Sequence, residues 1–189
     1  MYYGSMSDRA EERRMTLAEF LDWDDGTETR YELVDGVVYA MTTPATAHGA
    51  IAGVLGRLIG NQLKRPCRVL HQAPIALPAH RDTCYEADIA VACTPHERGQ
   101  RVTPEPIVII EILSPSTARY DRSIKVADYT AIPSVQEVVL VASEARRAVV
   151  YRRDGDRWSV LNFIGQATLE LASVKCGIDL AEVYEGLEV

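Results

Sequence analysis

One acidic side chain stands inside the most apolar stretch of the chain. Residues 107–113 are all apolar except Glu111, and prolines lie at both ends of the stretch. A short run rich in isoleucine and valine is typical of a strand buried on both faces of a sheet. An ionised carboxylate there costs on the order of several kcal/mol unless a cation or hydrogen-bond donors compensate it. The sequence therefore predicts a group that faces Glu111.

A second carboxylate, Asp88, lies in another short apolar stretch, residues 85–92. If the two stretches are neighbouring strands, the carboxylates of Asp88 and Glu111 converge. Two such groups repel each other unless a proton or a divalent ion lies between them. A structural alternative stays open, because a salt bridge to a buried arginine and a place at a strand end would also account for the two charges.

Three polar side chains follow the Glu111 strand at helical spacing. We expect a helix over residues 118–131, on which Asp121, Lys125 and Tyr129 share one face within about 80°. A solvent-exposed Asp–Lys pair with a tyrosine packed on the sheet would have the same spacing. Because the helix begins where the Glu111 strand ends, we favour a face that adjoins the carboxylates.

The N-terminal part of the chain supplies two further polar candidates. Asp35-Gly36 separates two β-prone runs and predicts a hairpin over residues 31–41, whose first strand carries Glu32. Apolar residues at helical spacing predict a helix that is capped at Thr43-Pro44 and continues to about residue 64. His48 lies near its start, where a single histidine is more often an interior side chain than a catalytic one.

The remaining segments complete an α/β fold with a β-rich C-terminal meander. We expect short helices over residues 17–23 and after Asp179, and strands over residues 67–77, 135–142, 148–153, 157–163 and 169–171. This order predicts a mixed central β-sheet flanked by helices. The arginines between residues 146 and 157 are interpreted as a sheet edge rather than a phosphate-binding surface.

Composition is that of an ordinary globular protein. The 189 residues are 47% hydrophobic and 25% charged, and a chain of this length favours a single domain, over residues 15–189. Residues 1–14 are mostly polar, so we expect them to form a flexible segment. No apolar run approaches the ~20 residues that cross a bilayer. The first residues lack the apolar core of a signal peptide. We therefore expect a cytoplasmic protein without a membrane partner.

Cysteines and net charge exclude little. Four cysteines show neither a CxxC pair nor zinc spacing, so we expect reduced thiols at Cys67, Cys84, Cys93 and Cys176. A formal charge of -7 argues against a general nucleic-acid binder. It leaves room for a local basic groove, and acidic residues also suit a divalent metal.

Taken together, the chain resembles the restriction-endonuclease-like, or PD-(D/E)xK, superfamily, and within it the Uma2 (DUF820) family. The resemblance covers about residues 15–184 and is carried by Tyr31-Glu-Leu-Val-Asp-Gly36, Pro44 with His48, Ala87-Asp88-Ile-Ala-Val91, Glu111-Ile-Leu-Ser-Pro-Ser-Thr117, Asp121, Lys125 and Tyr129. Two residues depart from the superfamily pattern. Ala87 replaces the proline before the aspartate, and Leu113 stands where the superfamily has its lysine.

The resemblance implies a Mg²⁺-dependent DNA endonuclease, with Mn²⁺ as a substitute ion. It implies roles for seven residues: Asp88 and Glu111 as metal ligands, Lys125 as the lysine displaced to the next helix, Glu32, His48 and Tyr129 within the site, and Asp121 orienting Lys125. It also suggests a homodimer formed through the C-terminal meander.

Two other functions stay open. Leu113 and the negative charge also fit a nuclease-fold protein without catalysis, which would act as a dimeric binding or structural module. A glycosidase built on two carboxylates would need an aromatic sugar cleft. Trp23 and Trp158 are the only tryptophans, so the chain has few aromatic residues from which to build such a cleft.

Overall fold

The computed structural model describes residues 14–78, 82–114 and 121–189, without the side chains of residues 121 and 122. Its elements in chain order are α1 (Leu17–Asp22), β1 (Tyr31–Val34), β2 (Val37–Ala40), α2 (Thr46–Gly60), β3 (Arg68–Ala76), β4 (Cys84–Ala92), β5 (Pro106–Leu113), the π-helical turn η1 (Asp121–Lys125), α4 (Val126–Thr130), β6 (Glu137–Ala142), β7 (Arg147–Asp154), β8 (Arg157–Ile164), β9 (Thr168–Leu171), β10 (Cys176–Asp179) and α5 (Leu180–Val183).

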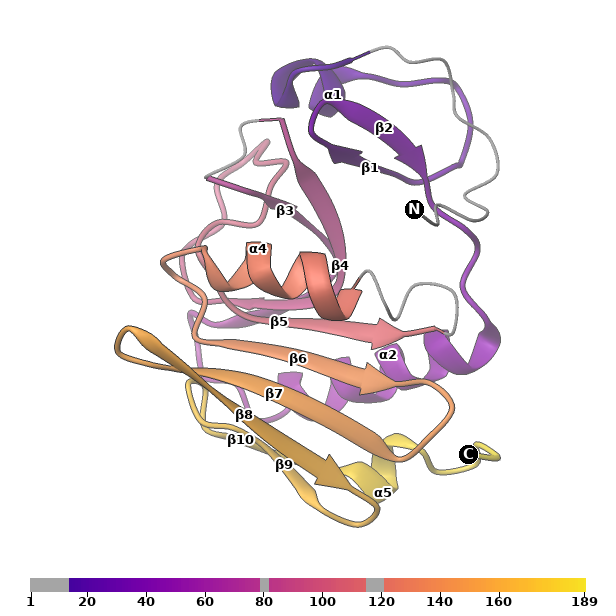
Figure 1. The fold of residues 1–189 in the computed structure, drawn as a ribbon, viewed down its shortest axis with the longest axis vertical. Coiled ribbons are helices and arrows are strands. Elements are labelled where there is room, and N and C mark those ends of the chain that lie inside the picture. The colour runs from indigo at the N-terminus through magenta and orange to yellow at the C-terminus, as the bar shows by residue number, and fades with distance from the viewer. Residues whose placement is uncertain (1–13, 79–81, 115–120) are drawn as a thin grey trace.

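A mixed sheet forms the centre of the molecule, as the sequence predicts (Figure 1). Its strand order is β2-β1-β4-β5-β6-β7-β8, and β3 also pairs with β4. Strands β5 and β6 are parallel, and the other pairs in the sheet are antiparallel. A parallel pair needs a crossover connection, and that connection contains η1 and α4. Because of this topology, the segment of η1 and α4 that carries Lys125 packs over β5, the strand that carries Glu111.

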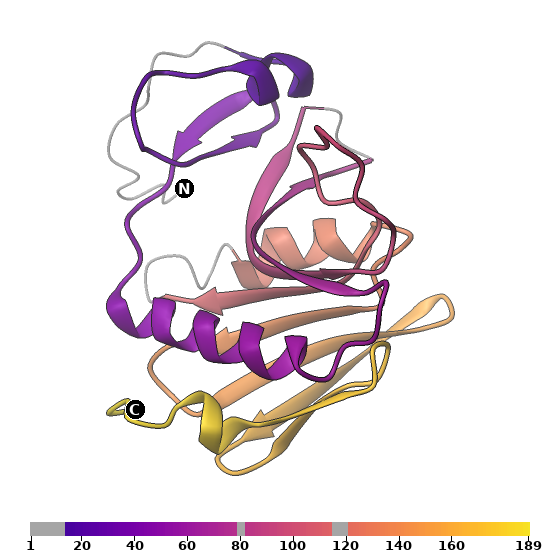
Figure 2. The same cartoon turned by 180° about the vertical axis from the view of Figure 1, so that it is seen from behind.

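Helices cover both faces of the sheet. In Figure 1, α4 lies in front of the strands, whereas α2 and the C-terminal α5 lie behind them, as Figure 2 shows from the other side. Strand β5 is buried on both faces, because Ile110 and Ile112 pack into the core under α2 while Ile109 and Leu113 pack under α4. Side chains alternate along a strand, so Glu111 points toward α4.

The β1–β2 hairpin and α1 form a small third core. Met15, Leu33 and Val38 are buried there. The hairpin turn has positive φ at Asp35 (49°) and Gly36 (80°), as an Asp-Gly turn requires. A side chain at Gly36 would also crowd the carbonyl oxygen of Met15, 3.2 Å from the ideal Cβ position. The predicted hairpin is therefore confirmed.

Two predicted helices differ from the sequence expectation. Helix α2 begins at Thr46 after Ala45, rather than at Thr43-Pro44, because the chain must first run extended from the hairpin to the far face of the sheet (Figure 2). The predicted helix over residues 118–131 is a π-helical turn followed by α4, and residues 118–120 lie outside the described part. The prediction of a regular α-helix was therefore wrong for residues 121–125, which form the π-helical turn η1.

Strand β10 was missed, because four residues that include Gly177 carry too weak a pattern to predict a strand. The short helix predicted after Asp179 is confirmed as α5. The Asp179 side chain accepts a hydrogen bond from the backbone N–H of Ala181, whereas the Glu182 carboxylate bonds Arg57. Most of the N-terminal segment over residues 1–14 lies outside the described residues, so its flexibility stays a prediction.

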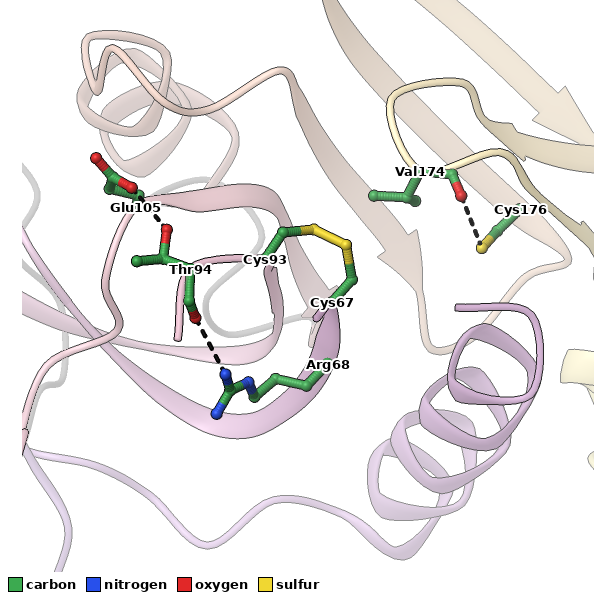
Figure 3. Close-up of a disulfide and its surroundings, with 7 residues drawn as sticks. All are labelled: Cys67, Arg68, Cys93, Thr94, Glu105, Val174 and Cys176. Carbon is green, nitrogen blue, oxygen red and sulfur yellow. Dashed lines mark hydrogen bonds between the residues drawn. A yellow bond between two sulfur atoms is a disulfide. The ribbon is translucent and has the colours of Figure 1, made fainter. Parts of the chain in front are cut away.

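The expectation of reduced thiols is wrong for one pair of cysteines. Cys67 and Cys93 form a disulfide across the ends of β3 and β4 (Figure 3). Arg68 lies opposite Ala92, so Cys67 and Cys93, the residues just beyond this pair, face each other. The two cysteines are 26 residues apart in the sequence, and this spacing alone does not predict their contact. Disulfides are rare in cytoplasmic proteins, so this bond is at odds with the expected location.

No described helix is long and apolar enough to cross a membrane.

A buried carboxylate joins the β9–β10 hairpin to the central sheet. Glu137 on β6 accepts hydrogen bonds from Arg152 Nε (2.8 Å), the backbone N–H groups of Ala172 and Ser173, and the Ser173 hydroxyl. Buried charges are tolerated when they are paired and fully hydrogen-bonded. Arg152 is therefore a structural residue, and it lies on β7, an inner strand that pairs with both β6 and β8.

Arg153 fixes the end of α4. Its Nη2 donates to the carbonyl oxygens of Thr130 and Ile132, both at 2.9 Å, and its Nε donates to Val135 O at 2.8 Å. The guanidinium carbon lies 4.4 Å from the centroid of the Trp158 ring. Carbonyl groups at a helix end lack partners within the helix. Arg153 supplies hydrogen-bond donors to these carbonyl groups and so stabilises the end of α4, the helix that carries Tyr129.

We expect Arg153→Met to lower the free energy of unfolding by about 2–4 kcal/mol, because several carbonyl oxygens lose a charged donor. Urea denaturation followed by circular dichroism measures this loss. Arg157→Met is the matched control on the same hairpin, where the arginine is exposed, and should change stability by less than about 0.5 kcal/mol. Equal effects of the two substitutions would refute the structural role of Arg153.

Candidate active site

The two predicted carboxylates meet where β4 and β5 separate. Ile89 lies opposite Ile110 in this antiparallel pair, and one further step in the same register sets Asp88 opposite Glu111. The Asp88 backbone N–H lies 3.4 Å from Glu111 Oε2. The regular ladder stops here, and the N–H of Ile112 donates to Asp88 Oδ2 at 2.7 Å. The expectation that the carboxylates lie on neighbouring strands is therefore correct, and each carboxylate contacts a backbone N–H of the other strand.

The groups that face Glu111 come from the helix after β5. Glu111 is 4% exposed. Tyr129 donates its hydroxyl to Glu111 Oε1 at 2.6 Å, and Lys125 Nζ lies 3.4 Å from the same oxygen. A short hydrogen bond and an ammonium together compensate a charge that the apolar strand could not hold by itself.

Lys125 lies between two carboxylates. Its Nζ donates to Glu32 Oε1 at 2.7 Å, in addition to the contact with Glu111, and its side chain is 7% exposed. Leu113, which occupies the position of the superfamily lysine, packs instead in the apolar core under α4. The helix thus supplies the cation that the strand lacks.

His48 reaches the site from the opposite side of the sheet. It lies in the first turn of α2, and its Nε2 is 3.1 Å from Asp88 Oδ2. Both side chains are mostly buried. Asp88 Oδ2 therefore contacts His48 on one side and the backbone N–H of Ile112 on the other. Asp121 begins η1, but its side chain lies outside the described part of the chain, so its role stays a prediction.

Sequence reasoning missed Tyr85. This buried residue donates its hydroxyl to Asp128 Oδ2 at 2.6 Å, and its ring packs edge-to-face against Tyr129 with centroids 5.7 Å apart. The Lys125 Nζ lies 5.2 Å from the centroid of the same ring. An aromatic ring within this distance attracts a cation. The aromatic position three residues before Asp88 was the only signal in the sequence.

Sequence reasoning also missed an ion pair beside the carboxylates. Arg30 Nη1 lies 2.5 Å from Glu86 Oε1, and the Glu86 N–H donates to Glu32 Oε1 at 3.0 Å. Burial raises the pKa of Glu86, the Arg30 charge opposes this shift, and the charges of Glu32 and Asp88 add to it. The thiol of the adjacent Cys84 has its pKa raised to about 12 by burial and by the charges of Glu32 and Glu86. Cys84 therefore stays protonated and unreactive.

The donor set suits a divalent ion that keeps part of its water shell. Within the described ranges no three His, Cys, Asp or Glu side chains converge to hold a metal by themselves. Mg²⁺ commonly takes one or two carboxylates and completes its shell with water and phosphate oxygens. Asp88 and Glu111 provide such a pair. Among described residues every hydrogen bond to the Asp88 carboxylate falls on Oδ2, so Oδ1 is available as a ligand.

Similar proteins occur in cyanobacteria. The uncharacterized protein slr1290 of Synechocystis sp. is 29% identical to this chain over 178 residues, which cover 92% of this chain and 93% of that protein. The uncharacterized protein sll1609 of the same organism is 24% identical over 167 residues, which cover 85% and 94%.

A solved structure shares the fold. It is the crystal structure of a "putative nuclease belonging to DUF820" from Anabaena variabilis, with a TM-score of 0.70 and 21% sequence identity, and the match covers 89% of this chain and 97% of that chain. The sequence model of the Uma2 family, described as "Putative restriction endonuclease", matches residues 17–181. This match includes every site residue predicted from the sequence, and the chain therefore belongs to the Uma2 family.

Proposed function

We propose that this protein is a metal-dependent endonuclease that hydrolyses phosphodiester bonds of DNA. Membership of a nuclease family supports this proposal. The observation that carries it furthest is the place of Lys125, whose Nζ lies 3.4 Å from Glu111 Oε1 although Leu113 occupies the usual lysine position. A carboxylate pair with an adjacent ammonium is what phosphodiester hydrolysis needs.

Asp88 and Glu111 would hold Mg²⁺, or Mn²⁺ in its place. When bound, the ion would lower the pKa of a water molecule and offset the negative charge that develops on the phosphate. The protein's own groups keep the two ligands in position. Tyr129 holds one oxygen of Glu111, while His48 and the Ile112 N–H hold one oxygen of Asp88.

Lys125 would stabilise the negative charge of the reacting phosphate. Its ammonium is already oriented by Glu32 and Glu111, so little reorganisation is needed during the reaction. The buried surroundings strengthen this interaction relative to water. Glu32 acts in this proposal as the group that positions Lys125 rather than as a metal ligand.

A second candidate is a nuclease-fold protein that binds or scaffolds without catalysis. The position of Lys125 is also consistent with this second function. A lysine held by two carboxylates neutralises their buried charge and can stabilise the fold without taking part in catalysis. The two functions are distinguished by metal-dependent cleavage of DNA, which the endonuclease shows and the non-catalytic protein does not.

We expect purified protein to cleave plasmid DNA in Mg²⁺ or Mn²⁺ and to lose this activity in EDTA. Asp88→Asn, Glu111→Gln and Lys125→Met should each lower the rate by roughly 10²–10³-fold, because each removes a group from the reacting centre. Lys64→Met and Asp156→Asn are the matched controls, since both residues are exposed and lie outside the site. Absence of cleavage in both metals would support the non-catalytic candidate.

A double variant separates catalysis from stability. Lys125→Met leaves Glu32 and Glu111 buried without a cation and should lower the free energy of unfolding by about 3–5 kcal/mol. Adding Glu32→Gln should recover part of this loss without restoring cleavage, as measured by urea denaturation and the plasmid assay. Recovery of cleavage together with stability would show that Lys125 has only a structural role.

We also propose a homodimer formed through the C-terminal meander. Strand β8 is the last strand of the main sheet, and its Val160 and Ile164 side chains are 53% and 67% exposed. An edge strand with exposed apolar side chains is a template for pairing with another chain. Analytical ultracentrifugation should find a dimer for the native protein and a monomer for Val160→Lys/Ile164→Lys. A native protein that stays monomeric would refute this assembly.

A further inference from the structure

A shallow hollow of about 340 Å³ lies at the open end of the β1–β2 hairpin. The residues that line it come from the segment before β1 and the segment that leads from β2 to α2: Glu28, Thr29, Arg30, Met41, Thr42, Thr43 and Pro44. Helix α2 begins two residues later, and its His48 contacts Asp88. The hollow therefore adjoins the candidate active site.

Arg30 is the cation of this hollow. Its Nη1 lies 2.5 Å from Glu86 Oε1, and its side chain remains 31% exposed. Within the described part of the chain Glu86 is its only charged partner, so most of its five N–H donors are available to a ligand. Arg152 and Arg153 differ in this respect, because their donors bond Glu137 and backbone carbonyl groups.

The spacing along β4 relates Arg30 to the reacting centre. Its partner Glu86 lies two residues before Asp88, which corresponds to about 6.7 Å along a strand. This distance is similar to the step between neighbouring phosphates of one nucleic-acid strand. Along β4, the Arg30–Glu86 pair and Asp88 are therefore about one phosphate step apart.

Charge explains why such a contact is needed. Glu32, Glu86, Asp88 and Glu111 surround the centre, and the whole chain has a net charge of -7. A polyanionic substrate approaching these carboxylates needs a cation beside them. A guanidinium suits this task, because its planar fork matches two phosphate oxygens.

The other polar groups of the hollow also suit a nucleic-acid backbone. Thr29, Thr42 and Thr43 are exposed, and hydroxyl side chains commonly bond phosphate and sugar oxygens. The Glu28 carboxylate lines the same hollow and would repel a phosphate. The favourable position is therefore the part of the hollow next to Arg30.

We propose that Arg30 binds the backbone phosphate next to the bond that is cleaved, and that this hollow is a sequence-independent subsite for the DNA strand. This inference rests on the proposed nuclease function. Contacts to phosphate fix the register of a nucleic acid without reading its bases. In the competing explanation, the Arg30–Glu86 pair only holds β1 against β4.

The salt dependence of DNA binding distinguishes these explanations. Affinity for a short fluorescein-labelled duplex is measured by fluorescence anisotropy at ~50–200 mM salt, in the Asp88→Asn background so that the duplex stays intact. Arg30→Met should reduce the slope of log affinity against log salt by about 0.9, the value of one lost phosphate contact. Arg30→Lys keeps a cation there and should keep the slope.

Arg57→Met is the matched control. Arg57 also pairs with a single glutamate, Glu182, but lies about 16 Å along α2 from Thr46. Its substitution should leave the slope unchanged. An unchanged slope for Arg30→Met, or equal slopes for Arg30→Met and Arg30→Lys, would overturn the phosphate contact and leave the structural explanation.

A modified substrate locates the contact. The bond that the native protein cleaves is first mapped on the duplex, and a methylphosphonate then removes the charge of the phosphate next to that bond. This change should weaken binding of the Asp88→Asn protein but not of the protein that also carries Arg30→Met. If the native protein cleaves DNA and both proteins respond equally to the modification, the subsite is refuted and the nuclease stands. If the native protein neither binds nor cleaves DNA, both proposals fail.

Discussion

The arrangement of this protein depends on one buried charge. Glu111 lies in the middle of a strand that is covered on both faces, where a carboxylate is unstable without compensation. The compensating groups, Lys125 and Tyr129, come from the crossover between the parallel strands β5 and β6. This crossover must pack on the face of the sheet to which Glu111 points. The same contacts that make the fold tolerate a buried carboxylate therefore build the candidate active site.

The surrounding structure keeps this crossover in place. Arg153 bonds the carbonyl groups at the end of α4, and the edge-to-face pair of Tyr85 and Tyr129 packs the helix on β4. Glu32 enters from the hairpin and takes the other side of the Lys125 ammonium. Each charged group is thus held by an element distant in sequence. A site assembled in this way requires the whole sheet, since no single segment contains its chemistry.

Much of this arrangement could be predicted from local patterns. The Asp-Gly turn is a short-range signal, and the structure confirms the hairpin that it predicts. The apolar run of residues 107–113 likewise predicts a strand buried on both faces, and β5 is such a strand. Predictions failed where longer-range packing decided. Helix α2 starts late because the chain must first cross to the other face of the sheet, and the bond between Cys67 and Cys93 forms because the register of β3 and β4 brings their ends together.

The sequence by itself determined which residues could carry the chemistry. A carboxylate inside an isoleucine-rich strand demands a partner whatever the fold, and helical spacing already grouped Lys125 with Tyr129. Only the tertiary structure decided what these groups contact. Glu32 pairs with Lys125, His48 with Asp88, and Arg30 with Glu86. The reason is physical, because strand order and register are set by burial summed over the whole sheet, whereas spacing along the chain reports only the nearest turns of helix and strand.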